Sequence, residues 1–125
     1  CNIRSTMNTT KDLSPIKKII TLPEFDQVIW FSNCEFSILK KYICKSFKEQ
    51  ISNETNNVAL TFNFEYKNLI LIWIDKDVCE KDFLRFLVHE SVHAANFVKD
   101  NTCITANDEF DACITSFIVS KILDK

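Results

Sequence analysis

Apolar positions recur along the chain with two different periods, and together they predict a mixture of strands and helices. Segment Gln27–Ser32 (QVIWFS) is rich in β-branched and aromatic residues, which is typical of a strand. Residues 58–66 alternate apolar with polar side chains, which predicts a half-buried strand, and residues 68–75 are almost uniformly apolar, which predicts a more fully buried one. The short connection between these last two segments predicts an antiparallel hairpin.

Three further stretches place their apolar residues at the spacing of a helix. They are residues 35–51, 78–98 and 108–123. The resulting order of strand, helix, hairpin, helix and helix is typical of an α+β domain. We therefore expect one such domain over residues 17–125, preceded by a polar and flexible segment at residues 1–16.

Composition and charge narrow the range of partners. The chain has 125 residues, 46% of them hydrophobic and 26% charged, which fits one globular domain. The net charge is -2 and no basic cluster outweighs its acidic neighbours, so we expect no nucleic-acid partner. Because no apolar run is long enough to cross a bilayer, we expect no membrane association either.

The cysteines bear on the cellular compartment. There are six of them and none forms a CxxC pair. Cys44, Cys79 and Cys113 lie within apolar stretches, where a free thiol packs as a small hydrophobic group. We therefore expect a reduced protein located in the cytoplasm.

The stretch LVHESVHAANF, residues 87–97, contains the only two histidines of the chain. His89 and His93 are four residues apart on a predicted helix, so they lie one turn apart on the same face and can hold one ion. Glu90 lies about 100° further round the helix axis, beside the position of a water rather than of a ligand. In H-E-x-x-H sites this carboxylate is the general base. The flanking residues are apolar, and a buried histidine or glutamate without a partner is costly, which favours a metal over a chance pattern.

A catalytic zinc site needs a third protein ligand. Our candidate is Glu109, which follows His93 by 16 residues and lies in the first turn of the last predicted helix. Phe117 occupies the same stripe of that helix and is expected in the core, so Glu109 should face the preceding helix. The favourable effect of the helix dipole explains an acidic first turn equally well. The alternative ligands are Asp108, one position round, and Cys113, one turn further on.

The sequence HESVHA, followed by the acidic helix DEFDA, resembles the zincin metallopeptidases and, more narrowly, the small H-E-x-x-H proteins encoded by bacteriophages. The resemblance extends from about residue 22 to the C-terminus. It implies a minimal zincin-like fold, with a small mixed sheet, an N-terminal helix, an active-site helix and a C-terminal helix. It also implies Zn²⁺ as cofactor with His89, His93 and Glu109 as ligands, Glu90 as catalytic base, a peptide or protein substrate, and the host cytoplasm as location if the protein is phage-encoded.

The sequence departs from the zincin pattern in one respect that bears on mechanism. No further histidine is present to stabilise an oxyanion. The residues left for that role are Tyr42, Tyr66, Arg85 and Lys99. The chain also offers little material for a substrate cleft, so we expect a peptide to add along an exposed sheet edge.

Two functions follow from these patterns. The first is a zinc-dependent hydrolase, most simply a metallopeptidase. The alternative is a non-catalytic, zinc-containing binding or inhibitor module that acts on a host protein. The presence of Glu90 favours the first, because a purely structural zinc site does not need a general base.

Overall fold

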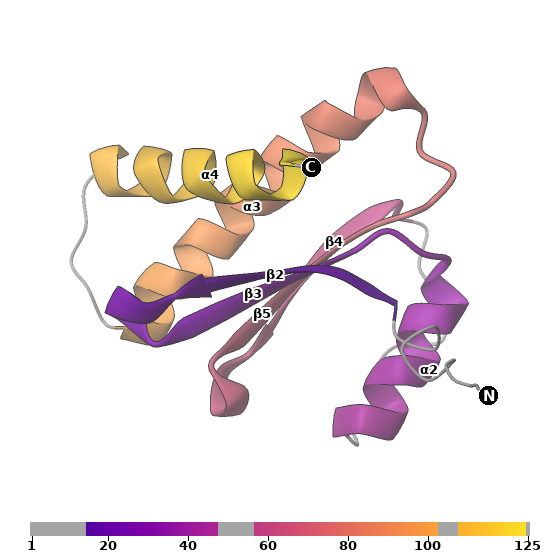
Figure 1. Ribbon diagram of the computed structural model, residues 1–125, viewed down its shortest axis with the longest axis horizontal. Coiled ribbons are helices and arrows are strands. Elements are labelled where there is room, and N and C mark those ends of the chain that lie inside the picture. The colour runs from indigo at the N-terminus through magenta and orange to yellow at the C-terminus, as the bar shows by residue number, and fades with distance from the viewer. Residues whose placement is uncertain (1–14, 48–56, 103–107, 125) are drawn as a thin grey trace.

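The computed structural model describes residues 15–47, 57–102 and 108–124. These residues form a four-stranded sheet with one helix on one face and two on the other (Figure 1). The strands are β2 (Ile16–Leu22), β3 (Gln27–Ser32), β4 (Ala59–Phe64) and β5 (Leu69–Ile74). The helices are α2 (Phe36–Phe47), α3 (Glu80–Thr102) and α4 (Asp108–Leu123). The predicted α+β class is confirmed.

The sheet has the strand order β2-β3-β5-β4 and is mixed. Strands β2 and β3 are antiparallel, β3 and β5 are parallel, and β4 and β5 are antiparallel. The hairpin predicted for residues 58–75 is therefore confirmed, with Phe64 opposite Leu69 next to the turn. Helix α2 connects β3 to β4 in the chain. Strand β4 does not pair with β3 but lies beyond β5, at one edge of the described sheet.

Both hairpins turn through a residue in the left-handed conformation. Asp26 and Asn68 each have φ of 53°, at the end of the short 3-10 turns Pro23–Phe25 and Glu65–Lys67. The chain contains no glycine, and Asn and Asp are the other residues that tolerate this conformation best. The two turns are also joined, since the Asn68 side-chain amide donates to the Asp26 carboxylate over 3.2 Å.

The sheet separates the hydrophobic core into two parts, one on each of its faces. Strand β5 contributes to both halves because all six of its residues are buried. One face packs under α3 and α4, and its β5 residues are Ile70, Ile72 and Ile74. The other face packs under α2, and its β5 residues are Leu69, Leu71 and Trp73.

Strand β4 is half-buried, as the alternation in residues 58–66 predicts, since its four central residues are all of intermediate exposure. Its polar face lies toward α3, where Thr61 contacts Glu90 and Asn63 contacts Asn101. Helix α3 therefore covers the polar face of β4 in part.

Strand β2 was not predicted. Its sequence IKKIITL breaks strict alternation, and its pairing with β3 shifts between Ile16 and Lys18. Ile20 and Leu22 are nevertheless buried in the core beneath α3 and α4. Ile16 and the buried Pro15 also belong to the folded part, whereas residues 1–14 of the predicted flexible segment lie outside the described residues.

Helix α3 begins and ends later than the predicted range 78–98. Cys79 is its N-cap, since the backbone N–H groups of Asp82 and Phe83 both donate to the Cys79 carbonyl. At the other end the helix continues for four polar residues, Lys99–Thr102, two of which have partners elsewhere in the fold. In the described residues, no helix is long and apolar enough to cross a membrane.

Candidate metal and catalytic site

His89 and His93 point together on the outer face of α3. Their Nε2 atoms are 3.2 Å apart and both residues are exposed. Two nitrogens bound to one tetrahedral Zn²⁺ at about 2.0–2.1 Å would be separated by about 3.3–3.4 Å. The same distance also permits a hydrogen bond between one protonated and one unprotonated imidazole. The spacing of the two histidines therefore fits a shared metal ion, and without a metal it fits a hydrogen bond between them.

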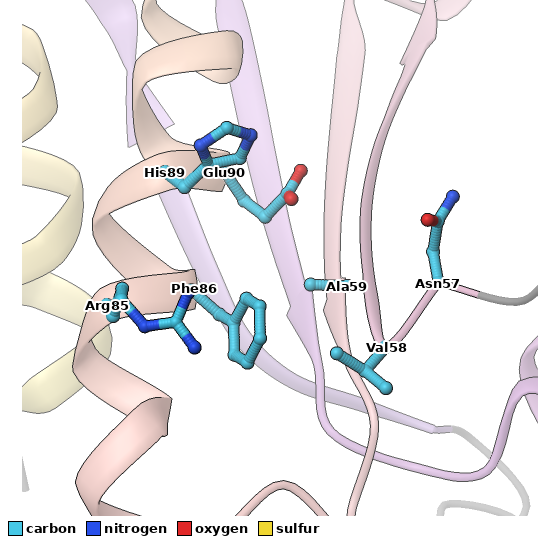
Figure 2. A pocket seen from close by; sticks show the side chains of 7 residues that line it. All are labelled: Asn57, Val58, Ala59, Arg85, Phe86, His89 and Glu90. Carbon is cyan, nitrogen blue, oxygen red and sulfur yellow. The ribbon is translucent and has the colours of Figure 1, made fainter.

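Glu90 points in a different direction and is buried. Only 6% of the residue is exposed, and its side chain extends from α3 toward β4 (Figure 2). The Thr61 hydroxyl lies 2.6 Å from Glu90 Oε1 and 3.1 Å from the Glu90 carbonyl oxygen. Because the hydroxyl has one proton, it donates to one of these oxygens at a time, and the carboxylate contact is the shorter.

A groove runs between α3 and the edge of β4 that faces away from β5. One part of it is a cavity of about 350 Å³ at the N-terminal end of β4. A second part, of about 380 Å³, continues along β4 past Thr61 to His93 and Phe97. His89 and Glu90 line both parts, so the histidine pair and the carboxylate meet in one solvent-accessible channel. The first cavity is lined by Asn57, Val58, Ala59, Arg85, Phe86, His89 and Glu90 (Figure 2).

Of the four residues considered for stabilising an oxyanion, Arg85 alone lines the groove. Lys99 instead forms an ion pair with Asp111 of α4, 3.2 Å away. Tyr42 packs against Trp30 on the opposite face of the sheet. Tyr66 lies in the turn after β4.

The buried face of α4 differs from the one used to place Glu109. Phe117 was expected in the core, but it is 39% exposed, whereas the neighbouring Ile118 is fully buried. The prediction for Phe117 is wrong, because α4 packs through the face that contains Ile118, one residue round the helix. Glu109 and Cys113 are exposed.

A third ligand is not grouped with the histidines in the described residues. No set of three His, Cys, Asp or Glu side chains there is placed to hold a metal ion. The side chain of Asp108 lies outside the described residues. The assignment of Glu109 as a ligand therefore stays a prediction.

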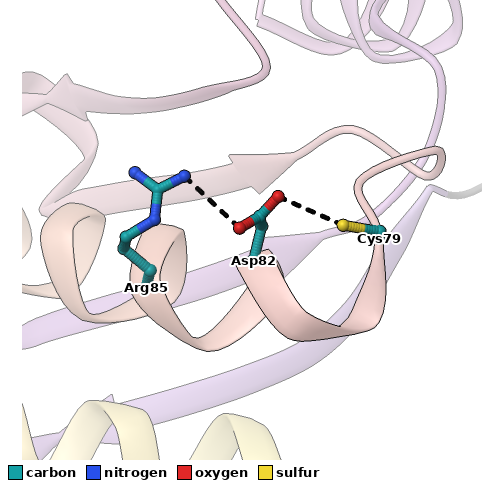
Figure 3. A network of polar contacts seen from close by, with 3 residues as sticks. All are labelled: Cys79, Asp82 and Arg85. Carbon is teal, nitrogen blue, oxygen red and sulfur yellow. Dashed lines mark hydrogen bonds and ion pairs between the residues drawn. The ribbon is translucent and has the colours of Figure 1, made fainter.

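The cysteines are more exposed than their apolar surroundings suggest. Cys79 and Cys113 are exposed, which corrects the expectation that they pack as hydrophobic groups. The Cys79 thiol donates to Asp82 over 3.1 Å, and Asp82 in turn lies 3.5 Å from Arg85 (Figure 3). Cys34 and Cys44 are half-buried, and burial raises the pKa of the Cys34 thiol. All four are free thiols.

Two residues of the site were not assigned to it from the sequence. Thr61 was assigned only to the polar positions of a half-buried strand, and Arg85 was one of four open candidates for stabilising an oxyanion. The signal for Thr61 was present, since polar residues that alternate along a strand mark one face. Which element covers that face depends on how α3 packs, and the local pattern carries no information on that.

Comparison of the chain with protein-family models, with curated proteins and with solved structures found no match.

Proposed function

We propose that the protein is a zinc-dependent hydrolase of the zincin type, most simply a metallopeptidase. The observation that supports this best is the 3.2 Å separation of the His89 and His93 Nε2 atoms. It is close to the separation that one tetrahedral Zn²⁺ requires, and the pair lies in the same groove as Glu90.

His89 and His93 would hold the ion through their Nε2 atoms, with Glu109 as the proposed third ligand. Bound zinc lowers the pKa of water toward 7 and polarises a carbonyl group. Glu90 accepts the proton of the attacking water and passes it to the leaving amine. Thr61 holds Oε1 of Glu90, so the other carboxylate oxygen is left to take part in the proton transfer.

The substrate proposed for this groove is an extended peptide. In the described residues, β4 is paired with β5 on one side only, so its other edge carries backbone groups available to a peptide. A chain added there passes along the groove beside His89, Glu90 and His93. Main-chain hydrogen bonds to β4 would supply affinity that depends little on substrate sequence.

The Glu90→Gln variant tests the catalytic role. The change keeps the size and much of the hydrogen bonding of the side chain but removes its ability to accept a proton. We expect hydrolysis of a peptide mixture, followed by mass spectrometry, to fall at least 100-fold, within the usual range for a general base, while zinc content is unchanged.

The matched control is Glu80→Gln, an exposed glutamate in the first turn of the same helix. It changes the net charge equally and should leave hydrolysis unaffected. Turnover that survives in Glu90→Gln would contradict the proposed mechanism.

One observation favours a second candidate, a non-catalytic zinc-containing binding or inhibitor module. Glu90 is buried and bonded to Thr61, so it links α3 to β4 whether or not catalysis occurs. For such a module, expressed in a bacterial host, wild type and Glu90→Gln should have the same effect on growth. A growth effect that is lost in a folded Glu90→Gln protein would reject this candidate.

A further inference from the structure

Arg85 lies at one end of the groove, one turn of α3 before His89. Its guanidinium is 4.5 Å from the centre of the Phe86 ring, and both residues line the cavity beside Glu90 (Figure 2). Stacking on a ring uses the face of a guanidinium and leaves its N–H donors at the edge. The Arg85 side chain is 67% exposed, so those donors are accessible from the groove.

The ion pair of Arg85 does not occupy these donors fully. Asp82 is its partner at 3.5 Å, and Asp82 also accepts from Cys79 (Figure 3). Both members of the ion pair are well exposed, and such pairs contribute little free energy. A guanidinium has five N–H donors and matches a carboxylate in two parallel hydrogen bonds. A carboxylate brought into the groove can therefore replace or share the contact with Asp82.

The direction of a bound peptide sets which part of it reaches Arg85. Antiparallel pairing is the more common and slightly more stable arrangement for an added strand. A peptide antiparallel to β4 has its C-terminal part beside the N-terminal end of β4. The cavity at that end is the one lined by Val58, Ala59 and Arg85.

We propose that Arg85 recognises a carboxylate on the C-terminal side of the scissile bond. The inference rests on the proposed function, because it assigns the substrate class of the same groove. The carboxylate is an acidic side chain or the free C-terminus of a short peptide. Phe86 and Val58 supply the apolar surface for the carbon atoms next to it.

The test uses degenerate peptide mixtures with the zinc-loaded protein, and mass spectrometry locates each cleaved bond. The mixtures carry Glu, Gln or Lys at one fixed position, each with a free or an amidated C-terminus. We expect cleavage before Glu, or near a free C-terminus, to exceed the neutral counterparts about tenfold in kcat/KM, as for a hydrogen bond to a charged group. Comparing Glu with Gln peptides tests recognition of a side-chain carboxylate. Comparing free with amidated peptides tests recognition of the C-terminal carboxylate.

Variants of Arg85 separate recognition from other roles. Arg85→Gln should lower kcat/KM for the carboxylate peptides about tenfold more than for their neutral counterparts, and Arg85→Glu should turn the preference toward Lys. Lys81→Gln, an exposed cation on the same helix outside the groove, is the matched control and should keep the preference. A uniform loss for all peptides in Arg85→Gln would overturn the inference, since it would show a role in oxyanion stabilisation instead.

A binding measurement decides the inference even without turnover. Zinc-loaded Glu90→Gln is titrated into fluorescent peptides with free or amidated C-termini, and with Glu or Gln at the fixed position. Tighter binding of the carboxylate forms that disappears in the double variant with Arg85→Gln supports the inference. Equal binding of the charged and neutral forms overturns it. Absence of any cleavage by wild type would contradict the hydrolase proposal alone.

Discussion

Thr61 and Glu90 hold each other across the junction of β4 and α3. The Thr61 hydroxyl is 2.6 Å from a carboxylate oxygen of Glu90, which is 6% exposed. A buried carboxylate is costly unless it is hydrogen-bonded, so this contact offsets the cost of placing Glu90 there. The same contact fixes the direction of Glu90 in the groove.

Replacing Thr61 with valine should therefore destabilise the protein. The change keeps the shape of the side chain but leaves Glu90 without this donor, which costs about 1–3 kcal/mol. Urea denaturation measures the free energy of unfolding. Thr21→Val, at an exposed position of β2, is the matched control and should change it by less than about 0.5 kcal/mol. Equal effects of the two variants would contradict the assigned role of Thr61.

The packed face of helix α4 could not be predicted from the local sequence pattern. The helix is apolar around most of its circumference, so the spacing of apolar residues does not identify the packed face. The sequence therefore assigned Phe117 to the core, whereas Ile118 is the residue fully buried there. An error of one residue rotates the helix by about 100°, which also moved the expected direction of Glu109.

Alanine substitutions at these two positions should differ in cost. Ile118→Ala leaves a cavity in a packed interior and should destabilise by about 2–5 kcal/mol. Phe117→Ala removes a side chain that is 39% exposed and should cost less than half of that. Thermal or urea unfolding of the two variants gives the order. A larger cost for Phe117→Ala would mean that α4 packs through the other stripe.

The strands differ in how far the sequence predicted them. Strands β3 and β5 have strong apolar runs, and their predicted positions are confirmed to within a residue. Strand β2 was missed because Lys18 is less exposed than the neighbouring Ile19, so its sequence does not alternate although its burial does. The parallel pairing of β3 with β5 joins segments more than 30 residues apart, and no local signal specifies such a pairing.

The sheet and α3 are locked together by a cluster of amide side chains far from the histidines. Asn101 near the end of α3 exchanges hydrogen bonds of 2.9 and 3.1 Å with Asn63 of β4. It also donates to the buried Gln27 of β3 over 3.0 Å. These contacts link the start of β3, the C-terminal end of β4 and the C-terminal turn of α3. They hold the helix that carries the site at a fixed position on the sheet.

Asn101→Ala should weaken this link. Gln27 loses a hydrogen-bond donor in a buried position and Asn63 loses its two hydrogen bonds with Asn101, which together cost about 1–3 kcal/mol. Urea denaturation measures the loss. Asp100→Ala, at an exposed neighbouring position, is the control and should be nearly neutral. If both variants were equally stable, the amide cluster would not hold α3 to the sheet.

The arrangement of layers explains why the site forms where it does. Helix α3 packs over β4 and β5 on one face of the sheet (Figure 1). This brings His89, Glu90 and Thr61 to one groove. The sequence identified the two histidines and the glutamate because their spacing within one helix is local. Thr61 entered the site through tertiary packing, whereas Arg85 lies one turn before His89 on the same helix. The third ligand stays a prediction for the same reason, since it depends on how a second helix lies against the first.

The most direct test of the account is the zinc content per chain, measured by elemental analysis on protein purified without a metal-binding tag. We expect close to one zinc per chain in wild type and in Glu90→Gln, and a large loss in His89→Ala and His93→Ala. Glu109→Ala should lose zinc if Glu109 is the third ligand, with Glu80→Ala as the exposed acidic control. Wild-type protein without zinc, even after reloading with the metal, would contradict the proposed metal site and the hydrolase function built on it.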